Sequence, residues 1–129
     1  MTFKVPENEA EIDANRAKFI KALINEDPHA QCRGELFMRE IPEDGKAAKE
    51  MRCAVGVAAK VFLGLNTKDE YLRYANPAEH YPGHDVYEEI ATMLGTTDGC
   101  THIWRLNDDD EKSFADVGAT LRNEWSLNE

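Results

Sequence analysis

The cysteine at position 53 is the residue of this 129-residue sequence whose type and position best suit catalysis. It stands at the head of residues 52–62, where small apolar residues predict a buried helix. A thiol at the start of a helix can act as a nucleophile, because the positive end of the helix dipole favours the thiolate. The same thiol can equally serve as a small apolar side chain inside the protein. The sequence leaves both interpretations open.

A cysteine hydrolase also needs a general base and a residue that orients the base. In chain order the candidates are Cys53, His102 and one of Asn107, Asp108 or Asp109. The order is that of papain-like enzymes, but the residues around the cysteine are not those of papain-like enzymes. We therefore expect a structural thiol and no catalytic residue. A Cys53-dependent hydrolase or transferase that uses His102 and Asp108 is the alternative.

Metal ions and cofactors have less support from the sequence. His80 and His84 flank a Pro-Gly pair that breaks a helix, so they are not held one helical turn apart as zinc ligands. Residues 107–111 are acidic but lack the alternating ligands and central glycine of a calcium loop. The sequence contains no glycine-rich phosphate loop. We expect no metal site and no cofactor.

Aromatic residues between positions 66 and 84 indicate protein binding instead. This segment is polar, contains prolines and glycine, and is expected to form a loop. Tyr71, Tyr74 and Tyr81 lie in it together with Arg73, and exposed aromatic side chains beside an arginine are typical of protein interfaces. Loops also carry binding residues more often than core elements do. We predict a binding surface here, with packing of the tyrosines onto the core as the alternative.

The charge of the chain limits the class of partner. Its 25 Asp and Glu residues outnumber its 15 Lys and Arg residues, which gives a formal net charge of −10. Direct binding to nucleic acid needs a basic surface and is not expected. An acidic surface serves solubility, attraction to a basic protein, or imitation of a nucleic-acid backbone. The acidic residues predicted to meet a basic partner are Glu7, Glu9, Glu11, Asp13, Asp108, Asp109, Asp110 and Glu111.

A binder of a small signalling nucleotide is a further alternative. It would require Arg52, Arg73 and Arg105 to converge on the phosphates.

The cellular location is predicted from other features of the sequence. No apolar run reaches the roughly 20 residues needed to span a bilayer, and the first residues lack the core of a signal peptide. The three cysteines are widely spaced and odd in number, as in a reducing compartment. We expect a cytoplasmic protein.

Capping pairs and apolar spacing predict the elements that position these residues. Pairs of polar residues three positions apart mark helix starts at Asn8, Asp85 and Ser113. Residues 31–41 are expected to be extended and to end in the turn 42–45. Segments 46–52 and 100–106 are compatible with strand or helix, and a turn is expected at 107–110. Residues 1–129 are predicted to form a single α+β domain, mostly helical with a small antiparallel sheet.

Three blocks of the sequence together resemble a group of small phage and bacterial proteins. The blocks are Gln31-Cys32-Arg33-Gly34-Glu35-Leu36, Cys53-Ala54-Val55-Gly56-Val57, and Leu106-Asn107-Asp108 leading to Ser113-Phe114-Ala115-Asp116-Val117. The group reads Q-x-x-G-x-L, C-C/A-L-G-V, a helix ending in Leu-Gly, and L-N-D…S-F-x-x-I-A. Residues 87–95 fit the helix, and the resemblance spans about residues 19–125. It implies a phage or mobile-element setting and no established activity.

The motif residues also have structural explanations. A glycine inside a helix is unfavourable by about 1 kcal/mol relative to alanine, so Gly56 is expected to allow close approach of another backbone. Gly34 is expected to meet the same need in the extended segment. Asn107 and Asp108 are expected to bond backbone groups and to fix the start of the last helix. The chain departs from the group at Gly118, where alanine is usual.

These observations lead to one prediction of function. The chain is expected to be a small acidic accessory protein, related to phages or mobile elements, that binds a host or defence protein with a basic surface. Imitation of nucleic acid is one form that such binding takes. A homodimer is left open, and enzyme activity is not expected.

Overall fold

The computed structural model describes residues 4–45, 47–78 and 83–127. Its elements in chain order are α1 (Glu9–Asn25), the short 3₁₀ helix η1 (Pro28–Ala30), β1 (Phe37–Glu40), β2 (Lys49–Arg52), α2 (Ala54–Leu63), α3 (Lys68–Ala75), α4 (Val86–Leu94), α5 (Thr101–Asp108) and α6 (Phe114–Glu124). The two strands form one antiparallel sheet. The mostly helical α+β architecture predicted from the sequence is confirmed.

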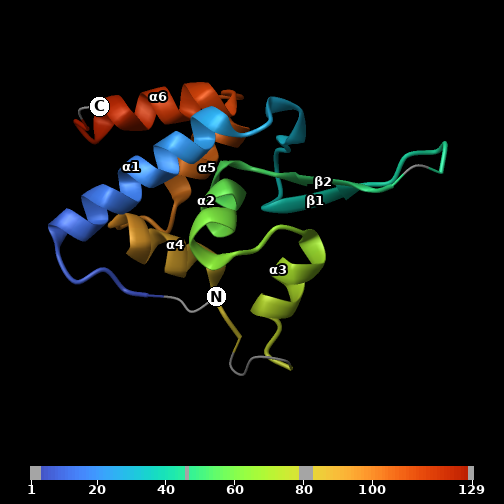
Figure 1. Cartoon of the computed structure of the whole chain (residues 1–129), viewed down its shortest axis with the longest axis horizontal. Helices are drawn as coiled ribbons and strands as arrows, with labels where there is room; N and C mark the ends of the chain where they lie inside the picture. The colour runs from blue at the N-terminus through green and yellow to red at the C-terminus, as the bar shows by residue number, and fades with distance from the viewer. Residues whose placement is uncertain (1–3, 46, 79–82, 128–129) are drawn as a thin grey trace.

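Helix α2 forms the centre of the core. Its first six residues, 54–59, are all buried, because small apolar side chains allow other elements to approach from every side. Helices α1, α4 and α5 pack against it, and α6 lies along α1 (Figure 1). The buried helix predicted for residues 52–62 is therefore confirmed from Ala54 onward.

The hairpin of β1 and β2 projects from the helical body (Figure 1). Its register pairs Phe37 with Arg52 at the base and Glu40 with Lys49 farther out. The base is buried, whereas Ile41 beyond it is 76% exposed. The segment left open at 46–52 is thus a strand over residues 49–52.

The predicted helix starts are confirmed. In each, a side-chain oxygen accepts a hydrogen bond from the backbone amide three residues later, which satisfies a donor that the helix leaves free. Left-handed glycines, Gly64 at φ 70° and Gly95 at φ 66°, end α2 and α4. The capping pairs are Asn8 with Glu11, Asp85 with Glu88 and Ser113 with Asp116.

Two predictions about loops are wrong. The segment expected to be a loop at 66–84 contains helix α3, whose start is a capping box between Thr67 and Glu70. The inner face of this helix consists of tyrosines, and none of its residues is fully buried, so the sequence shows no strongly apolar face that would indicate a helix. The turn expected at 107–110 is also shorter, because Asn107 and Asp108 belong to α5. Within the described residues, no helix is both long and apolar enough to cross a membrane.

Candidate functional site

Asn107, near the end of α5, joins the three segments that carry the sequence motifs. Its fully buried side chain accepts hydrogen bonds through Oδ1 from the amide of Ala54 at 3.0 Å and from Gln31 Nε2 at 2.7 Å. Its Nδ2 donates to the carbonyl of Cys32 at 3.0 Å and to Asp108 Oδ1 at 2.7 Å. Ala54 is the first residue of α2. The side chain of Asn107, which belongs to α5, therefore caps α2 in place of a side chain from the start of α2 itself. We call this set the Asn107 joint.

Residues of the first motif also fix the backbone between α5 and α6. Arg33 Nε donates to the carbonyl of Asn107 at 2.8 Å, and Arg33 Nη2 donates to that of Glu111 at 3.0 Å. Gln31 Nε2 donates to the carbonyl of Lys112 at 2.9 Å. Asn107 bonds backbone groups as predicted, but those groups belong to other segments. The backbone that leads into α6 is thus held by Arg33 and Gln31, rather than by Asn107 and Asp108.

The two motif glycines serve different purposes. A Cβ on Gly56 would lie 2.6 Å from the carbonyl oxygen of Leu36 and 2.8 Å from Arg52 Cβ. The close approach predicted for Gly56 is therefore confirmed. A Cβ on Gly34 would meet nothing within 4 Å, so the same prediction for Gly34 is wrong. Gly34 has φ +85°, a left-handed conformation that only glycine adopts readily.

A cleft of about 200 Å³ opens beside Cys53. Tyr87, Trp104 and Glu35 line this cleft, although the sequence did not predict them as site residues. Both aromatic side chains are partly buried against the core and also form walls of the cleft, so the core holds them in place. The motif blocks contain or adjoin most of the lining, and bringing the blocks together in space would have revealed it. The lining residues are Gly34, Glu35, Cys53, Tyr87, Trp104 and Asp108.

The fixed charges of the cleft are negative. The pKa of Cys53 is raised to about 12, chiefly by burial, with a small part of the increase due to the Asp108 carboxylate. Burial likewise raises the pKa of Cys32 to about 11, with added contributions from Glu35 and Asp108. Burial also raises the pKa of Tyr87. The thiols and the phenol are therefore neutral at pH 7, and the carboxylates of Glu35 and Asp108 determine the charge.

The structure does not bring the predicted catalytic residues together as a nucleophile and its base. Cys53 is 3% exposed, and the amides of Val55 and Gly56 lower its pKa less than burial raises it. His102 is exposed on α5, and its Nε2 lies 2.7 Å from Glu124 Oε1. Within the described residues, no hydrogen bond joins Cys53 to His102. The thiol is held as a neutral, buried group.

Two of the tyrosines predicted to bind a partner pack inward from α3. The ring of Tyr71 lies 5.5 Å from that of Phe37, and the ring of Tyr74 stacks on His84 at 4.1 Å. The Tyr74 hydroxyl donates to the Glu89 carboxylate. Burial raises the pKa of both tyrosines. Packing onto the core, the alternative left open by the sequence, is what the structure shows for these two side chains.

The other residues predicted to act in this segment are Arg73, His80, Tyr81 and His84. Arg73 is exposed on α3. Tyr81 and His80 fall outside the described residues. His84 Nδ1 lies 2.7 Å from Glu89 Oε2. In the part of the chain that the structure describes, no group of three His, Cys, Asp or Glu side chains is arranged to hold a metal ion.

The arginines of the nucleotide alternative have separate partners. Arg52 is buried, with Nη1 3.2 Å from Glu26 Oε1 and Nη2 3.0 Å from the carbonyl of Asn66. The guanidinium of Arg105 lies 5.8 Å from the centre of the Trp104 ring. Arg73 is exposed on α3, and within the described residues no contact joins the three arginines.

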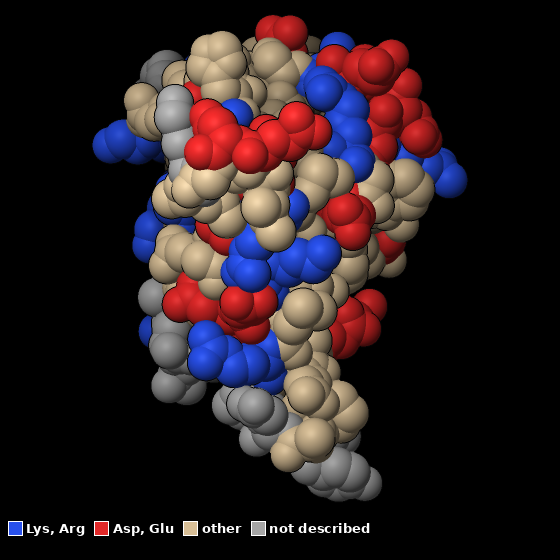
Figure 2. Space-filling view, turned by 90° about the vertical axis from the view of Figure 1, so that its right-hand side faces the viewer, with Lys and Arg blue, Asp and Glu red and all other residues tan. Residues whose placement is uncertain are grey.

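The acidic residues predicted to meet a partner divide into two groups. Asp109, Asp110 and Glu111 are exposed after α5, whereas Asp108 is half-buried and lines the cleft. The other predicted stripe, residues 7–13, lies at the start of α1. Figure 2 views the molecule from the side on which the hairpin projects, and this face carries both acidic and basic side chains. That face is not a continuous acidic surface.

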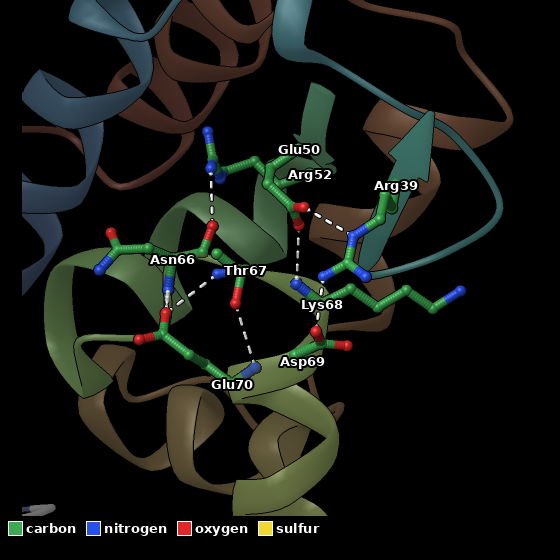
Figure 3. Close-up of polar contacts among 8 residues, drawn as sticks. All are labelled: Arg39, Glu50, Arg52, Asn66, Thr67, Lys68, Asp69 and Glu70. Carbon is green, nitrogen blue, oxygen red and sulfur yellow. Dashed lines mark hydrogen bonds and ion pairs between the residues drawn. The ribbon is translucent and has the colours of Figure 1, made fainter. Parts of the chain in front are cut away.

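A second polar joint fixes α3 to the hairpin (Figure 3). Glu50 Oε2 lies 2.8 Å from Arg39 Nε, and Glu50 Oε1 accepts from the amide of Lys68 at 3.0 Å. Arg39 Nη2 also pairs with Asp69 Oδ2 at 2.8 Å. Because Lys68 begins α3, Glu50 satisfies a free donor at a helix start. We call this set the Glu50 joint.

No known protein family, curated protein or solved structure matches this chain. Among the described residues, the cleft beside Cys53 offers the most defined chemistry.

Proposed function

We propose that the chain is a binding protein whose partner presents a basic surface, and that the cleft beside Cys53 is its principal contact. The composition of the cleft carries the proposal. Among the described residues, its lining includes two acidic side chains, Glu35 and Asp108, two aromatic ones, Tyr87 and Trp104, and no basic one. Carboxylates and aromatic faces both attract cations. The proposed occupant is therefore a cationic side chain of a protein.

The charge of the whole chain supports the same partner. A net charge of −10 attracts a basic protein over a distance and speeds encounter. The exposed carboxylates of Asp109, Asp110 and Glu111 directly follow Asp108, so a partner seated at the cleft would also meet them. Such attraction weakens with salt, because screening acts over about 10 Å at 0.1 M ionic strength.

The biological setting belongs to the proposal as well. Three free cysteines support a reducing, cytoplasmic location. The motif resemblance supports a phage or mobile-element protein acting on a host or defence protein. If the partner normally binds nucleic acid, the acidic surface would imitate the phosphate backbone.

The test is capture of a partner from host-cell lysate, followed by reconstitution with the purified partner. We expect one basic protein in stoichiometric amount, released as salt rises. The paired substitution Asp109→Asn and Asp110→Asn should weaken the reconstituted complex. The matched control, Glu40→Gln with Glu43→Gln on the exposed hairpin, removes the same charge and should have little effect. Absence of a basic partner at low salt, or binding that is insensitive to salt, would contradict the proposal.

A further inference from the structure

Resting on that proposed function, we infer that the cleft beside Cys53 receives the guanidinium group of an arginine from the partner. The walls supply the first argument. Tyr87 and Trp104 present aromatic surface to the cleft and are fixed by the core behind them. A planar guanidinium stacks on aromatic rings, whereas the compact ammonium of lysine is more strongly hydrated and favours water.

The carboxylates supply the second argument. Within the described residues, the Glu35 side chain has no hydrogen-bond partner, and Asp108 uses Oδ1 to accept from Asn107. Glu35 and the second oxygen of Asp108 are thus free to accept. A guanidinium carries five donors in a rigid fork and can bond to both carboxylates while its plane lies against a ring.

Size supplies the third argument. Pockets for drug-sized ligands occupy about 300–1,000 Å³. The cleft, at about 200 Å³, is smaller and suits the end of one side chain. This size also disfavours a nucleotide as the occupant. The neutral thiol of Cys53 in the lining neither repels nor competes for the cation.

Arg105 provides a sign test within the chain itself. Its guanidinium lies 5.8 Å from the centre of the Trp104 ring, yet Arg105 does not line the cleft. Its positive charge therefore opposes a second cation at the same ring. Replacing it with a neutral residue should strengthen binding of a cation, whereas replacing Glu35 should weaken it.

The experiment titrates N-acetyl-arginine methylamide into ¹⁵N-labelled protein and follows the indole N–H signal of Trp104, assigned with a Trp104→Phe variant. We expect a saturable shift with the arginine probe. The lysine probe should bind about fivefold more weakly, because its ammonium keeps its hydration. The neutral citrulline probe should give no saturable shift.

Variants define the site. Glu35→Gln should raise the Kd of the arginine probe about tenfold, the loss of one charge-assisted hydrogen bond. Glu43→Gln, the matched control on the exposed hairpin turn, changes net charge equally and should leave Kd unchanged. Arg105→Gln should lower Kd. Equal effects of Glu35→Gln and Glu43→Gln, equal shifts with arginine and citrulline, or no saturable Trp104 shift would overturn the inference.

The two proposals fail in different ways. If a basic partner is captured but Glu35→Gln does not weaken its binding and the arginine probe does not bind, the inference and the cleft contact are wrong, and the proposed basic partner stands. If the arginine probe binds but no basic protein is captured, the cation cleft stands and the proposed partner is wrong.

Discussion

The Asn107 joint and the Glu50 joint both fasten one segment to another, but they use opposite physical means. Asn107 is an uncharged amide that is fully buried and bonds backbone groups from two distant segments. The Glu50 joint consists of ions, and the side chains of Arg39 and Glu50 are 31% and 23% exposed. Both joints fix the start of a helix, which is α2 for the Asn107 joint and α3 for the Glu50 joint (Figure 3 shows the latter).

The difference indicates which joint governs stability and which governs placement. A buried polar group has given up its hydrogen bonds to water, and without a partner in the protein nothing offsets that loss. Breaking the Asn107 joint should therefore lower the stability strongly. Partly exposed ion pairs contribute little, because water competes with them and salt screens them. The Asn107 joint should thus hold the core and the cleft together, while the Glu50 joint positions α3.

The largest expected effect concerns the thiols beside the Asn107 joint. Because burial raises the pKa of Cys53 to about 12 and that of Cys32 to about 11, little thiolate exists at pH 7. We expect native protein to react with iodoacetamide at Cys53 at least about a hundredfold more slowly than the urea-unfolded chain. Mass spectrometry of timed samples measures this rate. Fast modification of the native protein at Cys53 would reopen the hydrolase or transferase alternative.

Breaking the Asn107 joint should come next. Asn107→Ala leaves the amide of Ala54 and the carbonyl of Cys32 buried without partners. We expect a loss of about 3 kcal/mol in the free energy of unfolding, measured by urea denaturation. Asn123→Ala, on the exposed face of α6, is the matched control and should change stability by less than about 0.5 kcal/mol. Similar losses of stability in both variants would show that the hydrogen bonds of Asn107 contribute no more than an exposed side chain does.

Two helical glycines, Gly56 in α2 and Gly118 in α6, test how closely other segments approach each helix. Gly56→Ala places a Cβ 2.6 Å from a backbone oxygen and should destabilise by about 1–3 kcal/mol. Gly118→Ala meets nothing closer than Ile24 Cγ1 at 3.4 Å and should stabilise by up to about 1 kcal/mol, through helix propensity. Urea denaturation of both variants measures the contrast. A stabilised Gly56→Ala protein would contradict the close approach of Leu36.

The smallest effect is expected at the Glu50 joint. The Lys68 amide, followed by Arg39, holds the pKa of Glu50 below its usual range. Its contribution is therefore present above the unfolded pKa of about 4.3 and is lost as pH falls through the lower folded value. Glu50→Gln should cost less than about 1 kcal/mol at pH 7. It should also make the fall in stability between pH 7 and 3 shallower, as measured by urea unfolding.

The matched control for Glu50→Gln is Glu43→Gln on the exposed hairpin turn. It should change neither the free energy of unfolding at pH 7 nor the fall in that free energy between pH 7 and 3. A loss at Glu50→Gln as large as that at Asn107→Ala would contradict the distinction between the two joints.

Helix starts could be predicted from the sequence because capping is local. Asn8, Asp85 and Ser113 each bond an amide three residues away, within reach of the same turn. The stops at Gly64 and Gly95 depend on one residue's backbone freedom. Helix α3 was missed because its inner face is made of half-buried tyrosines, whose packing on Phe37 and His84 involves other segments.

The sequence by itself determined the mostly helical α+β class, the ends of most helices, the acidic charge and the need for glycine at position 56. Only the tertiary structure decided that Asn107 caps α2, that Cys53 is a buried neutral thiol, and that Glu35, Tyr87, Trp104 and Asp108 share one cleft. The physical reason is range. Capping and helix ends depend on neighbours within one turn, whereas burial and a shared cleft depend on segments more than 50 residues apart that meet only in the folded chain.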